Sequence, residues 1–122
     1  MPTTGRTLLL RIALVLALLS LGYLATSPTQ VVLPETNDKL KHLAAFLLLA
    51  QLSDAAFPRR PWNWRKFIPL LGYGLLLECI QYFVPNRFFS LADLLADAVG
   101  LGLYPLVRIA LDKVWASFRS QP

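Results

Sequence analysis

Ionisable side chains interrupt the apolar stretches of this 122-residue chain, and their types are suited to proton transfer. His42 is the single histidine, and Glu78 lies inside an apolar run. An ionised side chain at mid-membrane costs roughly 2.5–3.5 kcal/mol on insertion scales, so such a residue is a functional hypothesis by default. Imidazole and carboxylate groups act as general acids and bases. His42 and Glu78 are therefore candidate catalytic residues, although the sequence does not decide whether any bond is broken.

The polar residues of each run repeat at helical spacing. Residues three or four apart share one face of a helix, which forms three stripes: Asp38 with His42, Glu78 with Gln81, and Asp93 with Asp97. Because lipid cannot satisfy these groups, we expect the stripes to turn inward towards one another. Glycines would let the third and fourth runs approach closely, at Gly72, Gly74, Gly100 and Gly102.

Residues beside the stripes indicate anion binding and helix capping. The guanidinium of Arg87 can clamp a phosphate or carboxylate with two hydrogen bonds, and Lys39 supplies a point charge. Ser90 is expected to be the N-cap of a helix, with Asp93 at the N3 position of an approximate capping box. A nucleophilic Ser90 hydroxyl is an alternative that no spacing requires.

The same residues have structural alternatives. His42 could be a hydrogen-bond partner of Asp38 or Glu78, and Glu78 could form an ion pair with Arg87 or Lys39. No two candidate ligands have the spacing of a metalloprotease motif, so neither a metal nor another cofactor is predicted.

Four apolar runs position these residues: 7–25, 40–57, 67–84 and 91–111. Each is long enough, as a helix, to match the roughly 30 Å hydrocarbon core of a bilayer. The chain is 56% hydrophobic and 16% charged, with a mean hydropathy of +0.52, whereas soluble domains are about 25% charged. We therefore predict one domain, residues 1–122, folded as an all-α four-helix transmembrane bundle. The second run is the least apolar and would need its neighbours as a shield.

Positive charge predicts the orientation of this bundle. Most Lys and Arg residues lie near the two termini and in the loop 58–66, which the positive-inside rule places in the cytoplasm. The segments 27–38 and 85–90 would then face outward. The net charge of +5 is read as a topology signal, with no nucleic-acid partner. The first run is expected to be retained as a helix, the alternative being a cleaved signal peptide.

Two more polar residues are given no chemistry. Cys79 lies in an apolar run and is expected to be a buried small hydrophobe. Asp54, one turn after Gln51, is interpreted as an interfacial residue beside the basic loop.

Three segments match a known pattern in order and spacing. The first contains Asp38, Lys39, His42 and Phe46, the second Glu78, Gln81, Phe83, Pro85 and Arg87, and the third Ser90, Asp93, Asp97 and Gly100. Over residues 35–105 the chain resembles the VanZ-like family of small bacterial membrane proteins. It departs from the family at Asp97, where the family usually has Asn.

The resemblance implies an envelope role more firmly than a reaction. The namesake of the family is linked to resistance to teicoplanin, a lipid-tailed glycopeptide, without remodelling of the peptidoglycan precursor. By resemblance, the core of the site is formed by His42, Glu78, Gln81, Arg87, Ser90 and Asp93.

The sequence thus predicts a multi-pass protein of the bacterial cytoplasmic (inner) membrane. Its outward-facing site would bind an amphiphilic, anionic cell-envelope ligand, such as a membrane lipid or a lipid-linked molecule. The ligand-binding residues would be Asp38, Lys39, His42, Glu78, Gln81, Arg87, Ser90, Asp93 and Asp97. The alternative is a non-catalytic scaffold whose polar cluster is structural, and a proton-coupled transporter is a third, weaker hypothesis. The polar second run would also favour pairing with a second copy.

Overall fold

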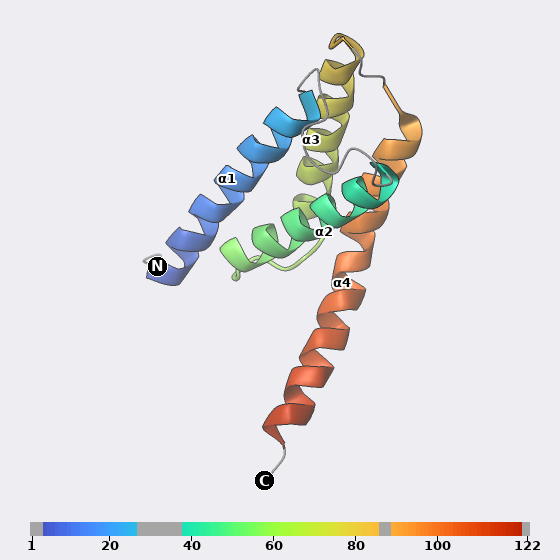
Figure 1. Ribbon diagram of the computed structural model, residues 1–122. Helices are drawn as coiled ribbons and strands as arrows, with labels where there is room; N and C mark the ends of the chain where they lie inside the picture. Colours follow the sequence, from blue (N-terminus) through green and yellow to red (C-terminus); the bar gives the residue numbers. More distant parts are fainter. Residues whose placement is uncertain (1–3, 27–37, 86–88, 121–122) are drawn as a thin grey trace.

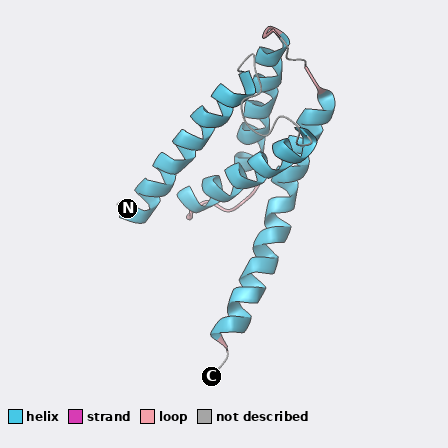
Figure 2. Cartoon of the chain, viewed as in Figure 1, coloured by secondary structure: helices cyan, strands magenta, loops and turns pink. Residues whose placement is uncertain are grey.

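The computed structural model describes residues 4–26, 38–85 and 89–120, and within them every regular element is a helix (Figure 2). The helices are α1 (Gly5–Thr26), α2 (Asp38–Ala56), α3 (Trp64–Tyr82) and α4 (Leu91–Arg119). The prediction of an all-α chain with four helices is confirmed.

Two helices extend beyond the predicted apolar runs. α3 begins at Trp64, because the side chain of Asn63 caps it by accepting a hydrogen bond of 2.9 Å from the backbone N–H of Arg65. α4 continues to Arg119, well past residue 111, because no proline or glycine interrupts residues 106–119. From Arg108 onward its residues are exposed, and this part of α4 projects away from the other helices (Figure 1).

The helices alternate in direction, with α1 and α3 running one way and α2 and α4 returning (Figure 1). Side chains tie neighbouring ends together. Arg11 Nε on α1 donates to the carbonyl of Ala56, the last residue of α2, at 3.0 Å. At the opposite end, Gln81 Nε2 on α3 donates to the carbonyl of Ala25 on α1 at 2.5 Å. Each end of the bundle therefore brings together residues that are far apart in the sequence.

α2 packs closely on α4 at a glycine. A Cβ on Gly100 would overlap the backbone carbonyl oxygen of Leu43, so the α4 backbone lies directly against α2 there. Gly74 on α3 faces Asp97 and Phe46, whereas Gly72 and Gly102 have no neighbour within 4 Å of an added Cβ among the described residues. The prediction that these four glycines bring α3 and α4 together is therefore wrong for Gly100, whose contact is α2. It is also wrong for Gly72 and Gly102, since nothing packs on them.

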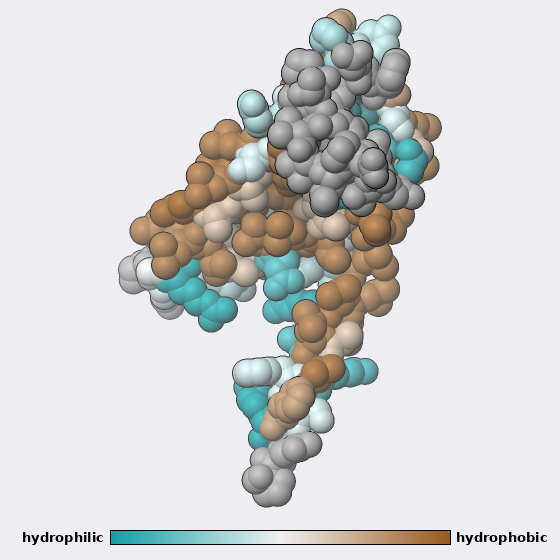
Figure 3. Space-filling view, in the orientation of Figure 1, coloured by the Kyte–Doolittle hydropathy of each residue, from teal (hydrophilic) through white to brown (hydrophobic). Residues whose placement is uncertain are grey.

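The core is small and its periphery is apolar. The buried cluster consists of Phe46, Leu49, Ala50, Leu70, Leu101 and Tyr104. α1 buries no residue, although most of its side chains are apolar, and hydrophobic side chains cover much of the visible face of the bundle (Figure 3). Cys79 is exposed on α3, so the prediction of a buried cysteine is wrong. It lies one residue from Glu78 and therefore points away from the face that α3 buries.

By length and composition, α1 and α4 are able to cross a membrane. α2 and α3 do not meet the same test, because every 18-residue stretch of either helix contains at least three charged residues. These come from Asp38, Lys39, Lys41 and Asp54 in α2, and from Arg65, Lys66 and Glu78 in α3. The prediction that the chain contains membrane-spanning helices is therefore supported for α1 and α4, two of the four helices.

Candidate functional site

Three helices bring one imidazole and two carboxylates together. His42 comes from α2, Glu78 from α3 and Asp97 from α4. His42 Nδ1 lies 2.7 Å from Asp97 Oδ1, and His42 Nε2 lies 4.0 Å from Glu78 Oε1. Glu78 and Asp97 are completely buried, and Gly74 and Gly100 are buried beside them. The predicted facing of the polar stripes is thus confirmed, and these residues form the core of what we name the His42 cluster, which also includes Asp93.

The hydrogen bond to Asp97 orients the imidazole. An ionised carboxylate accepts hydrogen bonds only, so beside an ionised Asp97 the His42 Nδ1 is the donor. In a neutral imidazole the lone pair of Nε2 then points away from Asp97, towards Glu78 and towards Asp93 Oδ2 at 3.5 Å. The predicted partners of His42 were Asp38 and Glu78. Among the described side chains, which do not include that of Asp38, the hydrogen bond of His42 is with Asp97, and Glu78 lies farther away at 4.0 Å.

Glu78 also completes the start of α4. Ser90 is the N-cap of α4, as predicted, because its hydroxyl oxygen accepts from the backbone N–H of Asp93 at 3.1 Å. A capping box would return a bond from the Asp93 side chain to the Ser90 N–H. Glu78 Oε2 takes that place and accepts from Ser90 N at 3.0 Å. One oxygen of Glu78 therefore fixes α3 to α4, and the hydroxyl oxygen of Ser90 has a structural role.

The other oxygen of Glu78 and one oxygen of Asp97 are buried without a hydrogen-bond partner among the described residues. They are Glu78 Oε1 and Asp97 Oδ2. Asp97 Oδ2 lies over Gly74, where an added Cβ would approach it to 2.7 Å. Leaving a buried polar atom unsatisfied costs about 1–3 kcal/mol, and more for a charged group. Two such atoms beside one imidazole are what a site prepared for a ligand would present.

The rim of the His42 cluster is more open to solvent. Lys39 Nζ lies 3.2 Å from Asp93 Oδ1, with the side chain of Lys39 55% exposed and that of Asp93 13% exposed. The side chain of His42 is 19% exposed. The cluster is therefore reachable from the side of Lys39, and this pair differs from the predicted alternative of Lys39 with Glu78.

One predicted site residue, Gln81, stands apart from the cluster. It is buried on the same face of α3 as Glu78, but its amide donates to the carbonyl of Ala25 and holds α1. The predicted roles of Asp38 and Arg87 fall on side chains that lie outside the described part of the structure.

A second buried cluster, centred on Asp54, was missed by the sequence analysis. Asp54 is 4% exposed. Its Oδ1 accepts from Lys66 Nζ at 2.6 Å, and its Oδ2 accepts from the Tyr104 hydroxyl at 2.6 Å and from Arg108 Nη1. Asp54 lies beside the basic loop, as predicted, because Lys66 belongs to that loop, but its burial among Lys66, Tyr104 and Arg108 was not predicted. The spacing of Tyr104 and Arg108, one turn apart on α4, was the available signal. We call this group the Asp54 cluster.

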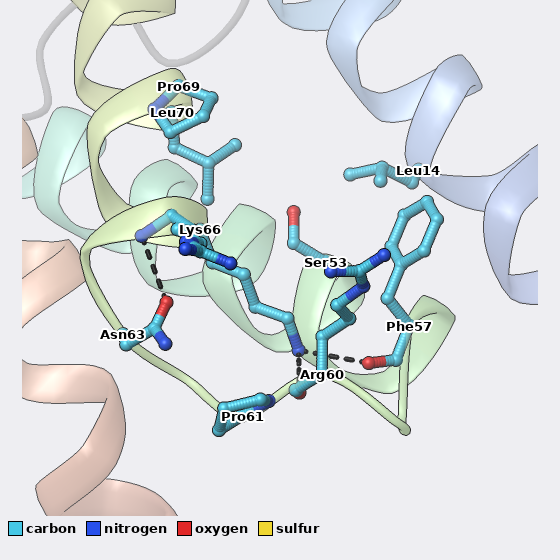
Figure 4. Close-up of a pocket in the computed structure, with 10 residues that line it drawn as sticks. Leu14, Ser53, Phe57, Arg60, Pro61, Asn63, Lys66, Pro69 and Leu70 are labelled. Atoms are coloured by element: carbon cyan, nitrogen blue, oxygen red, sulfur yellow. Dashed lines mark hydrogen bonds between the residues drawn. The ribbon is translucent and has the colours of Figure 1, made fainter.

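A cavity of about 520 Å³ adjoins the Asp54 cluster, between α1, α2 and the start of α3 (Figure 4). Lys66 lies at its wall, where its Nζ also donates to the carbonyls of Phe57 at 3.0 Å and Arg60 at 2.7 Å. The basic loop is thereby folded back onto the end of α2. Leu14 and Leu70 form apolar parts of the same wall.

Apolar side chains separate the two clusters. His42 and Asp54 both lie on α2, twelve residues or about 18 Å apart along a helix axis. Between them Phe46, Leu49 and Ala50 are buried. The described residues therefore offer no continuous line of polar groups from one end of the bundle to the other, which argues against a proton-coupled transporter.

Comparison with protein-family models, with curated proteins and with solved structures gave no match.

Proposed function

We propose that this protein is a VanZ-like, multi-pass protein of the bacterial cytoplasmic membrane, and that its His42 cluster binds the polar head of an amphiphilic envelope molecule. The carrying observation is a pair of buried carboxylate oxygens beside His42, Glu78 Oε1 and Asp97 Oδ2, which have no hydrogen-bond partner among the residues that the structure describes. In a structural cluster such oxygens would have donors, as they do at Asp54. A ligand head with hydroxyl or amine groups supplies donors, and Lys39 at the rim supplies a positive charge for its anionic part.

The proposal includes four membrane-crossing helices with both termini in the cytoplasm. The alternating helix directions and the apolar periphery support it (Figure 3). Within this bundle one acidic side chain of α2 and one of α3 are sheltered, since Asp54 and Glu78 are buried against neighbouring helices. The basic loop lies at the end of the bundle opposite His42. By the positive-inside rule the His42 cluster then faces outward.

The test is made in bacterial cells with Glu78→Gln and His42→Ala, using Asp112→Asn as a matched control. Asp112 is 74% exposed on α4 and far along the chain from the cluster. We expect all three variants to accumulate in the membrane. The change in sensitivity to a lipid-tailed glycopeptide should be lost in the two cluster variants and kept in the control.

Two results would overturn parts of this proposal. Loss of membrane accumulation in both cluster variants would favour the alternative, a scaffold in which the cluster is structural. Orientation is tested with single cysteines at Asn63 and Ser90 in a Cys79→Ala background, because Cys79 is itself exposed. Labelling of Asn63→Cys from outside intact cells would reverse the orientation.

A further inference from the structure

We propose that the His42 cluster binds a divalent transition-metal ion such as Zn²⁺, with His42 Nε2, Glu78 and Asp93 as its protein ligands and with Asp97 orienting the imidazole from the other side. The ion would occupy the same site as the proposed envelope molecule, and only the identity of that second, amphiphilic ligand rests on the proposed function. The sequence has no metal-ligand spacing within one helix. In the structure each ligand comes from a different helix.

The distances are close to those of a single ion. His42 Nε2 lies 4.0 Å from Glu78 Oε1 and 3.5 Å from Asp93 Oδ2. Zinc binds imidazole nitrogen and carboxylate oxygen at about 2.0–2.2 Å, so two ligands of a tetrahedral ion lie about 3.4 Å apart. Asp93 Oδ2 already lies near that distance from Nε2. Glu78 Oε1 must approach by a fraction of an ångström, which side-chain rotation supplies.

The lone pairs of the cluster converge without a donor. Glu78 Oε1 and Asp97 Oδ2 have no hydrogen-bond partner among the described residues, and Glu78 Oε1 is directed towards Nε2 of His42. With Nδ1 donating to Asp97 Oδ1, the neutral imidazole also presents a lone pair on Nε2. With a neutral imidazole, Glu78 Oε1 and Asp93 Oδ2 both face the Nε2 lone pair, and a cation between the three atoms would satisfy all of them. An imidazole oriented by an outer carboxylate, as His42 is by Asp97, is typical of metal sites.

Charge also favours a divalent ion. Glu78, Asp93 and Asp97 are three carboxylates around His42, and the ammonium of Lys39 forms an ion pair with Asp93. With ionised carboxylates and a neutral imidazole, these five side chains together carry two more negative than positive charges. A bare site of this kind would repel an anionic head group. A bound divalent ion balances the excess and can accept a phosphate, carboxylate or hydroxyl oxygen at an open coordination position.

The ligand set indicates the class of metal. Imidazole nitrogen suits Zn²⁺, Fe²⁺ and Ni²⁺ better than Mg²⁺ or Ca²⁺, which prefer sites made of oxygen alone. The partial exposure of His42 and Asp93 at the rim gives the ion a route of entry. Asp93 Oδ2, at 3.5 Å from Nε2, is the first carboxylate that an entering ion meets.

The experiment titrates Zn²⁺ and Co²⁺ into the full-length chain, purified in detergent and stripped with a chelator. The readouts are calorimetry for Zn²⁺ and the visible absorption bands of four-coordinate Co²⁺. We expect one ion per chain, with an affinity that falls as the pH is lowered, since protons compete for His42. His42→Ala and Glu78→Gln should each weaken binding by about 100-fold or more, because even outer-shell substitutions cost 10–100-fold. Asp112→Asn should bind as the wild type does.

Two results would overturn the metal proposal: no stoichiometric ion on the wild-type chain, or equal binding by the wild type and by every folded cluster variant. Circular dichroism reports which variants fold. If no cluster variant folds, the titration of the wild-type chain alone decides whether the metal binds. The proposed function is tested separately. If the wild-type chain binds the metal but Glu78→Gln cells keep the wild-type change in drug sensitivity, the metal proposal stands and the envelope-ligand proposal fails. If Glu78→Gln cells lose that change but the wild-type chain binds no metal, the envelope-ligand proposal stands and the metal proposal fails.

Discussion

The two polar clusters of this protein differ in whether their buried carboxylates are satisfied. At the Asp54 cluster both oxygens of one carboxylate receive hydrogen bonds, from Lys66, Tyr104 and Arg108. At the His42 cluster three carboxylates share one imidazole, and two of their oxygens have no donor among the described residues. A satisfied cluster contributes to holding helices together, whereas an unsatisfied one lowers stability until a ligand completes it. We therefore propose that the first is a structural joint and the second a binding site.

The largest effect on stability is expected from Asp54→Asn. Removing one partner of a buried charged group typically costs about 3–5 kcal/mol, because the remaining charges are left uncompensated. Here we expect about 3 kcal/mol, since the side chain of Arg108 is 55% exposed while that of Lys66 is 10% exposed. Unfolding in detergent micelles measures the loss, with Asp112→Asn as the control. Asp112 lies 3.9 Å from the same Arg108 but is exposed, so its loss should stay below about 0.5 kcal/mol.

An intermediate effect is expected where α2 and α4 touch between the clusters. In Gly100→Ala the new methyl group would overlap the carbonyl of Leu43, and overpacking of this kind costs about 1–3 kcal/mol. Gly102→Ala is the control, because nothing lies within 4 Å of its added Cβ among the described residues. That change should raise the unfolding free energy by about 0.5–1 kcal/mol. Equal effects of the two substitutions would show that α2 and α4 are not in contact at Gly100.

The smallest effect is expected at the rim of the binding site. Lys39→Gln removes the ion pair with Asp93, whose lysine is more than half exposed. Exposed pairs of this kind contribute about 0.2–1 kcal/mol, so the unfolding free energy should barely change. Binding of an anionic head group should weaken, and salt should weaken it less in the variant than in the wild type. A stability loss as large as that of Asp54→Asn would assign Lys39 to the structural class instead.

Much of the fold and the facing of its polar residues could be predicted from the sequence. Four apolar runs separated by polar segments give four helices, and the helical spacing of Asp93, Asp97 and Gly100 gives one stripe, which is buried at Asp97 and Gly100. These predictions depend on local periodicity. Helix ends were less predictable, because they depend on caps such as Asn63 and on the absence of breakers after residue 106.

Contacts between helices could not be predicted from spacing alone. His42 bonds to Asp97 because of the way α2 crosses α4, and no pattern within α2 specifies that crossing. The Asp54 cluster was missed for the same reason, since its partners come from α3 and from the middle of α4. Gln81 shows the limit of reasoning from a shared face, because its amide reaches a carbonyl on α1.

The central claim is that Glu78 serves binding and Asp54 serves stability, and Glu78→Gln tests it most directly. Gln has the same shape, and its amide oxygen can still accept from the Ser90 N–H, so the start of α4 is preserved. The substitution also removes a buried charge that has one oxygen without a donor. Measured beside Asp54→Asn in detergent, Glu78→Gln should leave the unfolding free energy within about 1 kcal/mol of wild type or raise it. A loss of about 3 kcal/mol, equal to that of Asp54→Asn, would contradict the account and make the His42 cluster a second structural joint.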